Sequence, residues 1–353
     1  MNSNCAVFGC TITNRYTTMD TKALRQKILD LAIHGKLVPQ DPNDEPASVL
    51  LERIKAEKER LIKEGKIKRS KKSAKTSDTP HYENVPFEVP SSWVWCRLDD
   101  IVSFQGGYAY KSNTYVNQSD WQVIRIGNVK NDNLILDIQP VFVEDVIGKT
   151  TEKYLLKKDD ILFTMTGTKG KRDYFYTAKV PSIKKNLLLN QRVGCLRCFS
   201  SEINIDFLCL VLKGEYVLDA IFSTETGNVS QGNIGSESTL NLNIAIPPLT
   251  EQHRIVVEIE KWFALIDQIE QGKSDLQSTI KQTKSKILDL AIHGKLVPQD
   301  PNDEPASELL KRINPNFTPC DNGHYPAGWQ QTILGELFNH NTGLSLIHIS
   351  EPT

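Results

Sequence analysis

The strongest constraint on the fold of this chain is an internal duplication. The stretch KILDLAIHGKLVPQDPNDEPAS runs from Lys27 to Ser48 and occurs again, letter for letter, from Lys286 to Ser307. Self-similarity at a long spacing indicates that one structural unit is used twice. Within the stretch an apolar run stops at a His-Gly pair, and a loop with three prolines follows, which is typical of a helix end and a turn-rich connection. We therefore expect a helix end, a Pro-rich loop and a second helix in each copy.

A second, weaker sequence similarity follows each copy of the repeat. Pro90 and Trp93 have counterparts in Pro326 and Trp329. These residues predict that a globular domain begins shortly after each copy of the repeat.

Apolar side chains recur with a 4-3 spacing ahead of the second copy. Such a seam predicts a coiled-coil helix, about 50 Å long at roughly 1.5 Å per residue. Gly294 suits the left-handed residue that ends a helix. The first copy keeps only the end of this pattern, so we expect the missing part of its helix at the far end of a longer chain. The seam consists of Ile255, Ile259, Trp262, Ile266, Ile269, Leu276, Ile280, Ile287 and Leu290.

These patterns divide the chain into six segments. Residues 1–18 lack periodicity and are expected to be unstructured and non-native. The last residues, LSLIHISEPT, resemble translated sequencing-adaptor read-through, so we expect an artefactual tail on a truncated second domain. The other segments are a helical region with a basic linker (19–80), a first globular domain (81–249), a long spacer helix (250–294), the second loop and helix (295–321) and the start of a second domain with the tail (322–353).

Local signals refine this organisation. Asp20 or Thr21 is expected to cap the first helix, and Ser48 the helix that carries Leu50, Leu51 and Ile54. Residues 205–217 are more helix-like than their surroundings. Short apolar or alternating runs between turn residues predict a mixed α/β domain with a mainly β core. The expected strands are Trp93–Leu98, Val123–Ile126, Leu134–Ile138, Ile161–Met165 and Gln191–Cys198.

The net charge of −1 conceals a polarised distribution of charge. Ten basic residues stand against three acidic ones between Lys55 and Lys75, and eleven against three between Lys153 and Arg197. Such clusters suit a polyanionic partner. No apolar run approaches the roughly 18 residues of a membrane span, and no signal core is present, so we expect a cytoplasmic protein without a membrane partner.

No motif for covalent chemistry is complete. The Gly167–Arg172 segment resembles a phosphate-binding loop, but it lacks the required glycine spacing, and Arg172 replaces the magnesium-binding hydroxyl residue. Cys195 and Cys198 form a single Cys-x-x-Cys, which favours two thiols in a strand over a zinc site. We expect no catalytic residue, no metal, no cofactor and no small-molecule substrate.

Binding residues are better represented. Lys169, Lys171 and Arg172 precede three aromatic residues in a Gly-broken loop, and such a mixture can neutralise phosphates and pack on sugars or bases. The alternative is an exposed hairpin whose aromatic side chains turn inward. Polar groups that could read base edges are Gln105, Lys111, Arg125, Asn128, Gln191 and Arg192.

Taken together, the chain resembles the specificity subunit of a type I restriction-modification system. The resemblance rests on LRQKILDLAIHGKLVPQDPNDEPAS, VPSSWVWCRLDDIVSFQGGYAYKS, WQVIRIGNV, KKDDILFTMTGTKGKR, LNQRVG and TGNVSQGNIGSESTLNLNIAIPPLTEQHRIVVEIE. It extends from Met19 to about Phe338.

The resemblance implies two target-recognition domains joined by long antiparallel helices, and residues 81–249 would be the first of these DNA-binding domains. It also implies that the heptad seam belongs to the docking surface for partner subunits. Each domain would read one half of a split site in double-stranded DNA, and the helices would set the spacing and dock methyltransferase subunits, which restriction subunits then join. Methylation of a flipped adenine with S-adenosylmethionine would belong to the partner. The residues to which the resemblance gives a DNA-contact role are Lys169, Lys171, Arg172, Gln105, Tyr108, Lys111, Gln191 and Arg192.

Two other functions remain open from the sequence. A half-sized specificity protein could restore two-fold symmetry by pairing with a second copy through the heptad seam. Alternatively, the chain could be a coiled-coil adaptor that binds only protein, in which case the basic loop is a solvated surface.

Overall fold

The computed structural model describes residues 20–68, 85–228, 230–320 and 323–338. The expected unstructured start, most of the basic linker and the tail after residue 338 lie outside these ranges. The chain forms two compact units, residues 1–267 and 268–353, and each is treated by itself below.

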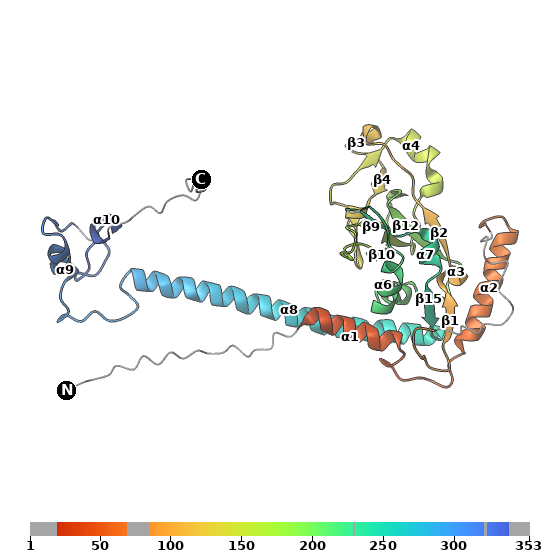
Figure 1. The fold of residues 1–353 in the computed structure, drawn as a ribbon, viewed down its shortest axis with the longest axis horizontal. Helices are drawn as coiled ribbons and strands as arrows, with labels where there is room; N and C mark the ends of the chain where they lie inside the picture. Colours follow the sequence, from red (N-terminus) through yellow and green to blue (C-terminus); the bar gives the residue numbers. More distant parts are fainter. Residues whose placement is uncertain (1–19, 69–84, 229, 321–322, 339–353) are drawn as a thin grey trace, which may run out of the picture. The chain divides into compact units, whose positions relative to one another are not determined.

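The helices confirm a mixed architecture with one long helical element (Figure 1). They are α1 (Thr21–Ile33), α2 (Ala47–Lys63), α3 (Leu98–Ile101), α4 (Asp145–Thr150), α5 (Ile205–Val211), α6 (Glu215–Phe222), α7 (Ser236–Leu240), α8 (Leu249–Ile292), α9 (Ala306–Ile313) and α10 (Leu334–Leu337).

The described strands all lie in the first unit. They are β1 (Val94–Arg97), β2 (Val102–Gly106), β3 (Tyr115–Val116), β4 (Trp121–Ile124), β5 (Val129–Lys130), β6 (Asn133–Leu134), β7 (Phe142–Val143), β8 (Ile161–Thr164), β9 (Thr166–Gly167), β10 (Thr177–Lys179), β11 (Asn186–Leu189), β12 (Val193–Cys198), β13 (Thr226–Gly227), β14 (Gly232–Asn233) and β15 (Asn243–Ile246).

Two four-stranded sheets form the centre of the globular part. One has the order β10-β8-β12-β2 and is antiparallel throughout. The other has the order β11-β4-β7-β3, in which only the β11–β4 pair is parallel. Smaller sheets pair β1 with β15, β5 with β6, and β14 with both β13 and β9. The mixed, mainly β domain expected from the sequence is therefore confirmed.

Four of the five predicted strands are present, but Leu134–Ile138 is wrong beyond its first residue. Side-chain amides occupy the carbonyl groups that a neighbouring strand would need. Asn128 Nδ2 donates to the carbonyl oxygens of Ile135 and Ile138, at 3.0 and 3.1 Å. Gln122 Nε2 donates to Leu136 O at 2.7 Å. Side-chain amides from 7 to 14 residues upstream thus satisfy these backbone carbonyls without a neighbouring strand.

The start of α8 belongs to the core of the first unit. Ile255, Ile259 and Ile266 are buried in one apolar cluster with Ile28 and Ile33 of α1. Arg25, near the start of α1, forms an ion pair with Asp267 at 2.6 Å. The loop after α1, in contrast, contacts the first turn of α8. The start of α1 therefore lies beside a later part of α8, and the two helices run antiparallel, side by side (Figure 1).

The long helix is confirmed, but not every seam position lies on its buried face. Trp262 is exposed, while its neighbour Phe263 packs against the core and lies under the guanidinium of Arg25. The side chains of the later seam positions Ile269, Leu276, Ile280 and Ile287 are exposed, and Leu290 is half-buried.

The helix ends follow the sequence with one exception. Asp20 caps α1 by accepting from Ala23 N at 3.0 Å, as predicted. The predicted cap Ser48 is wrong, because α2 begins at Ala47 and the N-cap is Pro46. The amide of Ala47 donates to Ser92 O at 2.9 Å, so a distant loop satisfies this helix end.

Candidate nucleic-acid interface

The basic loop between β9 and β10 turns through several residues with left-handed backbone geometry. Gly170, Arg172 and Phe175 have positive φ angles of 75°, 49° and 61°. Asp173 Oδ1 accepts from Thr168 N at 2.7 Å, and hydrogen bonds from Thr168 hold the pKa of Asp173 below its usual range. The three predicted cationic side chains, Lys169, Lys171 and Arg172, are exposed on this loop.

Two of the three aromatic residues of the loop turn inward, as the alternative interpretation of the sequence has it, and the third, Tyr176, is half-buried. Tyr174 and Phe175 are buried, and Phe175 lies 5.2 Å from the ring of Phe163. Tyr174 Oη donates to Glu225 Oε1 at 2.5 Å, and burial together with this carboxylate raises the pKa of Tyr174. These rings anchor the loop to the core and are not available to a base or sugar.

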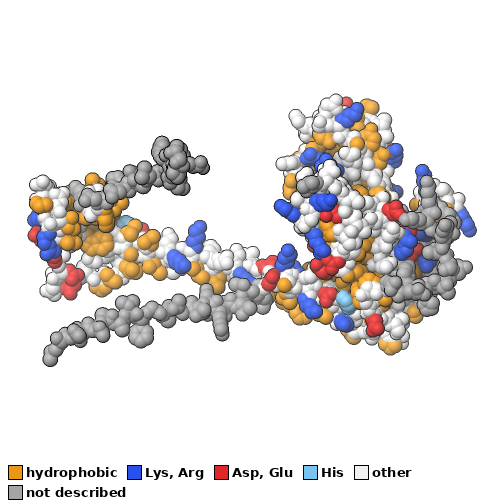
Figure 2. Space-filling model, in the orientation of Figure 1, with side chains coloured by type: hydrophobic (Ala, Val, Ile, Leu, Met, Phe, Trp, Pro, Cys, Tyr) orange, Lys and Arg blue, Asp and Glu red, His pale blue; other side chains and the backbone are white. Residues whose placement is uncertain are grey.

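Carboxylates of α6 and its C-terminal flank face the basic loop. Arg172 pairs with Glu215 at 3.3 Å and with Asp219 at 2.7 Å. Glu225 accepts from the amide of Gly170 at 3.1 Å. Figure 2 shows Lys and Arg side chains interspersed with Asp and Glu on the side of the globular unit where β9 and α6 lie. Part of the positive charge of the loop is therefore offset within the chain.

A second group of predicted residues meets where β11 and β12 are joined. The amide of Gln191 donates to Tyr108 O at 3.0 Å. The amide of Met165, one residue before β9, donates to Arg192 O at 3.0 Å. The side chains of Tyr108, Gln191 and Arg192 are exposed. The backbone thus connects this group directly to the strand that leads into the basic loop.

Tyr108 is the centre of an aromatic cluster with a cation at its edge. Its ring lies 5.0 Å from Tyr110 and 5.4 Å from Tyr154. Lys153 Nζ lies 4.9 Å from the ring centroid of Tyr154, within range of a cation–π interaction. We name Tyr108, Tyr110, Lys153 and Tyr154 the tyrosine cluster. The sequence prediction missed Lys153 and Tyr154, although Lys153 begins the basic segment and an aromatic residue follows it.

Three other residues predicted to read bases form hydrogen bonds with the backbone of the protein itself. Asn128 is buried, and its side chain also accepts from Arg125 N at 2.9 Å. Arg125 Nη2 donates to Gln139 O at 2.7 Å. Gln105 Nε2 donates to Lys153 O at 2.7 Å, so it positions the tyrosine cluster. Lys111 is exposed, one residue beyond Tyr110.

The described residues offer little acid–base or metal chemistry. They contain no group of three or more His, Cys, Asp or Glu that could hold a metal ion. Cys195 and Cys198 lie in β12 as predicted, and burial raises the pKa of Cys198 to about 12. No helix among these residues is long and apolar enough to cross a membrane.

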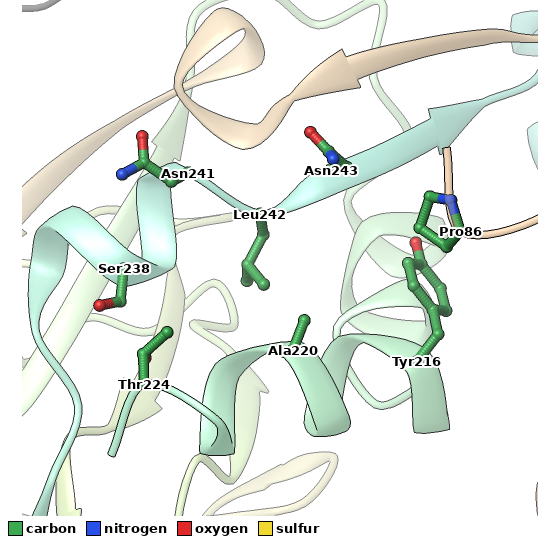
Figure 3. Close-up of a pocket in the computed structure, with 8 residues that line it drawn as sticks. All are labelled: Pro86, Tyr216, Ala220, Thr224, Ser238, Asn241, Leu242 and Asn243. Atoms are coloured by element: carbon green, nitrogen blue, oxygen red, sulfur yellow. The ribbon is translucent and has the colours of Figure 1, made fainter. Parts of the chain in front are cut away.

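A pocket of about 250 Å³ lies between α6 and the segment that leads into β15 (Figure 3). The lining side chains are neutral, and burial raises the pKa of the one ionisable group, Tyr216. The lining residues are Pro86, Tyr216, Ala220, Thr224, Ser238, Asn241, Leu242 and Asn243.

Curated relatives of the chain are specificity subunits. It is 32% identical to the type I restriction enzyme EcoEI specificity subunit of Escherichia coli, across 94% of this chain and 64% of that protein. It is 30% identical to the EcoAI specificity subunit of the same organism, across 91% of this chain and 63% of that protein. The chain thus spans just under two thirds of the length of these relatives.

Solved structures and a family model complete the comparison. The crystal structure of the HsdS subunit from Thermoanaerobacter tengcongensis matches with a TM-score of 0.40 at 16% identity, over 78% of this chain and 57% of that one. Residues 90–277, more than half of the chain, match the type I restriction modification DNA specificity domain. The chain therefore belongs to the family of type I restriction-modification specificity subunits.

Proposed function

We propose that the globular unit binds double-stranded DNA and recognises one half of a split site. The observation that carries this proposal is the tyrosine cluster, in which Tyr154 lies 5.4 Å from exposed Tyr108 and 4.9 Å from Lys153 Nζ. The exposed residues Gln191 and Arg192 adjoin the cluster through the hydrogen bond from Gln191 N to Tyr108 O. Aromatic faces and cations can pack on sugars and neutralise phosphates. Arginine and glutamine side chains suit guanine and adenine edges in the major groove. This surface is the base-reading part of the proposed interface.

The basic loop is the proposed phosphate contact. Lys169 and Lys171 are exposed cations, whereas Arg172 already pairs with two carboxylates on α6. A phosphate would have to compete with Glu215 and Asp219 for the guanidinium. We therefore expect the two lysines to contribute more to the salt dependence of binding than Arg172 does.

Salt-dependent DNA binding tests the proposal. Each phosphate that a protein neutralises adds about 0.9 to the steepness of log K against log salt concentration. Replacing Lys169, Lys171 and Arg172 with Ala is expected to make this slope shallower by about 2. A matched control removes three exposed lysines from α8, namely Lys281, Lys284 and Lys286, and should leave the slope unchanged. Equal slopes for wild type and the loop variant would favour the adaptor that binds only protein.

We also propose that the exposed seam of α8 docks methyltransferase subunits, which carry out adenine methylation and which restriction subunits then join. Leu276, Ile280 and Ile287 present exposed apolar side chains at helical spacing, and such a face suits a partner helix. Ile280→Asp should abolish co-purification with the methyltransferase while DNA binding by the globular unit persists. Lys281→Asp is the neighbouring control. An intact complex with Ile280→Asp would contradict the docking role.

A further inference from the structure

The hairpin formed by β13 and β14 lies beside the strand that leads into the basic loop. β14 pairs antiparallel with β13 on one side and with β9 on the other, where Gly232 stands opposite Gly167. The end of β9 that continues into the basic loop therefore adjoins the end of the hairpin where its two strands connect. Lys169 Nζ bridges the two segments by donating to the carbonyl oxygen of Gly227, the last residue of β13, at 3.1 Å.

One carboxylate fixes the hairpin against the basic loop. Glu225, which immediately precedes β13, accepts from Gly170 N at 3.1 Å and from Tyr174 Oη at 2.5 Å. A Cβ atom at Gly232 would lie 2.1 Å from Glu225 Oε1 and 2.6 Å from Tyr174 Oη, so only a glycine permits this approach. The hairpin and the basic loop therefore form one structural unit, and a ligand bound to one lies next to the other.

Two carboxamide side chains are exposed on the hairpin. Asn228 follows β13 and Gln231 precedes β14, and both are exposed, whereas Ile234 beyond β14 is buried. Gln231 Nε2 donates to Asn233 Oδ1 at 3.3 Å. A carboxamide presents a donor and an acceptor together, and this combination matches the N6 donor and N7 acceptor of adenine in the major groove. The exposed side of the hairpin therefore carries groups that suit base edges.

The hairpin also continues the surface that carries the tyrosine cluster. Ile234 N donates to Met165 O at 2.9 Å, and Met165 N donates to Arg192 O at 3.0 Å. These hydrogen bonds place the hairpin, the segment that enters β9 and the turn at Arg192 side by side. Gln191, in the same turn, donates through its amide to Tyr108 O. The candidates for base reading on the hairpin and around Tyr108 therefore lie on neighbouring segments, with β9 between them.

Building on the DNA-binding function proposed above, we propose that the hairpin β13–β14 is a second base-reading element, with Asn228 and Gln231 in the major groove and Lys171 on an adjacent phosphate. The major groove admits a two-stranded β-ribbon, and Asn and Gln are the side chains that pair with adenine there. Lys169 has three donors, so it can contact a phosphate while it keeps its hydrogen bond to Gly227. In this arrangement the lysines set the affinity for any DNA, and the two carboxamides set the preferred bases.

Selection of bound sequences from a pool of DNA duplexes with a randomised segment tests this role in the full chain. The wild type should enrich particular bases. Asn228→Ala with Gln231→Ala should lose the preference at about one or two base pairs, where discrimination falls about 5- to 150-fold, and should keep it elsewhere. The salt dependence of binding should not change, because no charge is removed. Lys171→Ala should have the opposite effect, keeping the enriched bases and making the slope of log K against log salt concentration shallower by about 0.9.

A matched control replaces Asn117 and Gln118 with Ala. These neighbouring carboxamides are also exposed, but they lie on the connection between β3 and β4. Gln118 lines a surface pocket with Asp120, Glu144 and Asp145, and these carboxylates repel a polyanion. The control variant should therefore retain both the enriched bases and the salt dependence of the wild type.

A substitution that changes the preferred base is the second arm. Gln231→Glu keeps the length of the side chain but leaves only acceptors, so it should replace a preference for adenine by one for cytosine, whose N4 amino group is a donor. Binding by the wild type without enrichment of any base, or the same enriched bases in the wild type and both hairpin variants, would overturn the base-reading role and leave DNA binding intact. A shallower salt dependence of the double variant with unchanged base preference would likewise overturn it. A wild type that binds no duplex would instead contradict the proposed function, and the base-reading role with it.

Discussion

Identical residues have opposite surroundings in the two copies of the repeat. Ile33, at the end of α1, is 3% exposed, whereas its counterpart Ile292, at the end of α8, is 53% exposed. The same holds for Leu29 and Leu288, at 6% and 62%. Both segments are helical and both end at a left-handed glycine. Local sequence therefore determines the helix and its end, while burial depends on what lies beside it, which in the first copy is the start of α8.

Matched charge substitutions give the sharpest test of this contrast. Ile33→Asp places a carboxylate in the apolar cluster and should destabilise the first unit by about 3–5 kcal/mol. Ile292→Asp changes an exposed position and should stay within about 0.5 kcal/mol. Hydrogen exchange resolved along the chain would measure each unit separately.

If Ile292→Asp were as damaging as Ile33→Asp, the end of α8 would be buried in solution. For the same reason we expect Ile266→Asp to unfold the first unit, because Ile266 is fully packed there. It is thus unsuitable for testing subunit docking, whereas Ile280→Asp is suitable.

Unlike the charge substitutions, glycine substitutions should lower the free energy of unfolding by similar amounts in the two copies. Gly35→Ala and Gly294→Ala each place a Cβ at a positive φ angle and against a proline ring. Each should cost about 2–3 kcal/mol in its own unit. Gly65, at φ 69° with open space around it, is a control in which Ala should cost only about 1 kcal/mol. A tolerated Gly294→Ala would mean that the second loop is not closed like the first.

Features set by local sequence could be predicted, and features set by distant contacts could not. The seam spacing predicted α8, and the His-Gly pairs predicted both helix ends. The inward turn of Tyr174 depends on Glu225, and the pairing of Arg172 depends on Asp219, both far along the chain. The tyrosine cluster likewise joins Tyr108 to a segment that periodicity does not link to it. For the candidate site, the sequence identified basic and aromatic residues as candidates. It could not predict which of their side chains are exposed or which residues they contact, because these depend on the fold.

The smallest expected difference concerns the two aspartates of the repeat. Asp44→Ala removes the interactions with Thr250 and Arg254 and should cost the first unit about 1–2 kcal/mol, because solvent partly screens Arg254. Asp303→Ala should cost the second unit about 0 kcal/mol, within about 0.5. Urea unfolding of each variant against the wild type measures both.

The pH dependence of this difference follows from the ion pair. The hydrogen bond from Arg254 holds the pKa of Asp44 below its ordinary 3.8. The carboxylate therefore contributes stability above that unfolded value, and the contribution disappears as pH falls through the lower folded value. Burial raises the pKa of neighbouring Glu251, which acts in the opposite direction, but it is present in both proteins and largely cancels when Asp44→Ala is compared with the wild type. The difference in free energy of unfolding between the wild type and Asp44→Ala should have its full value at about pH 6 and vanish in strong acid. A difference in stability between the wild type and Asp44→Ala that does not change with pH would mean that Asp44 acts through packing alone.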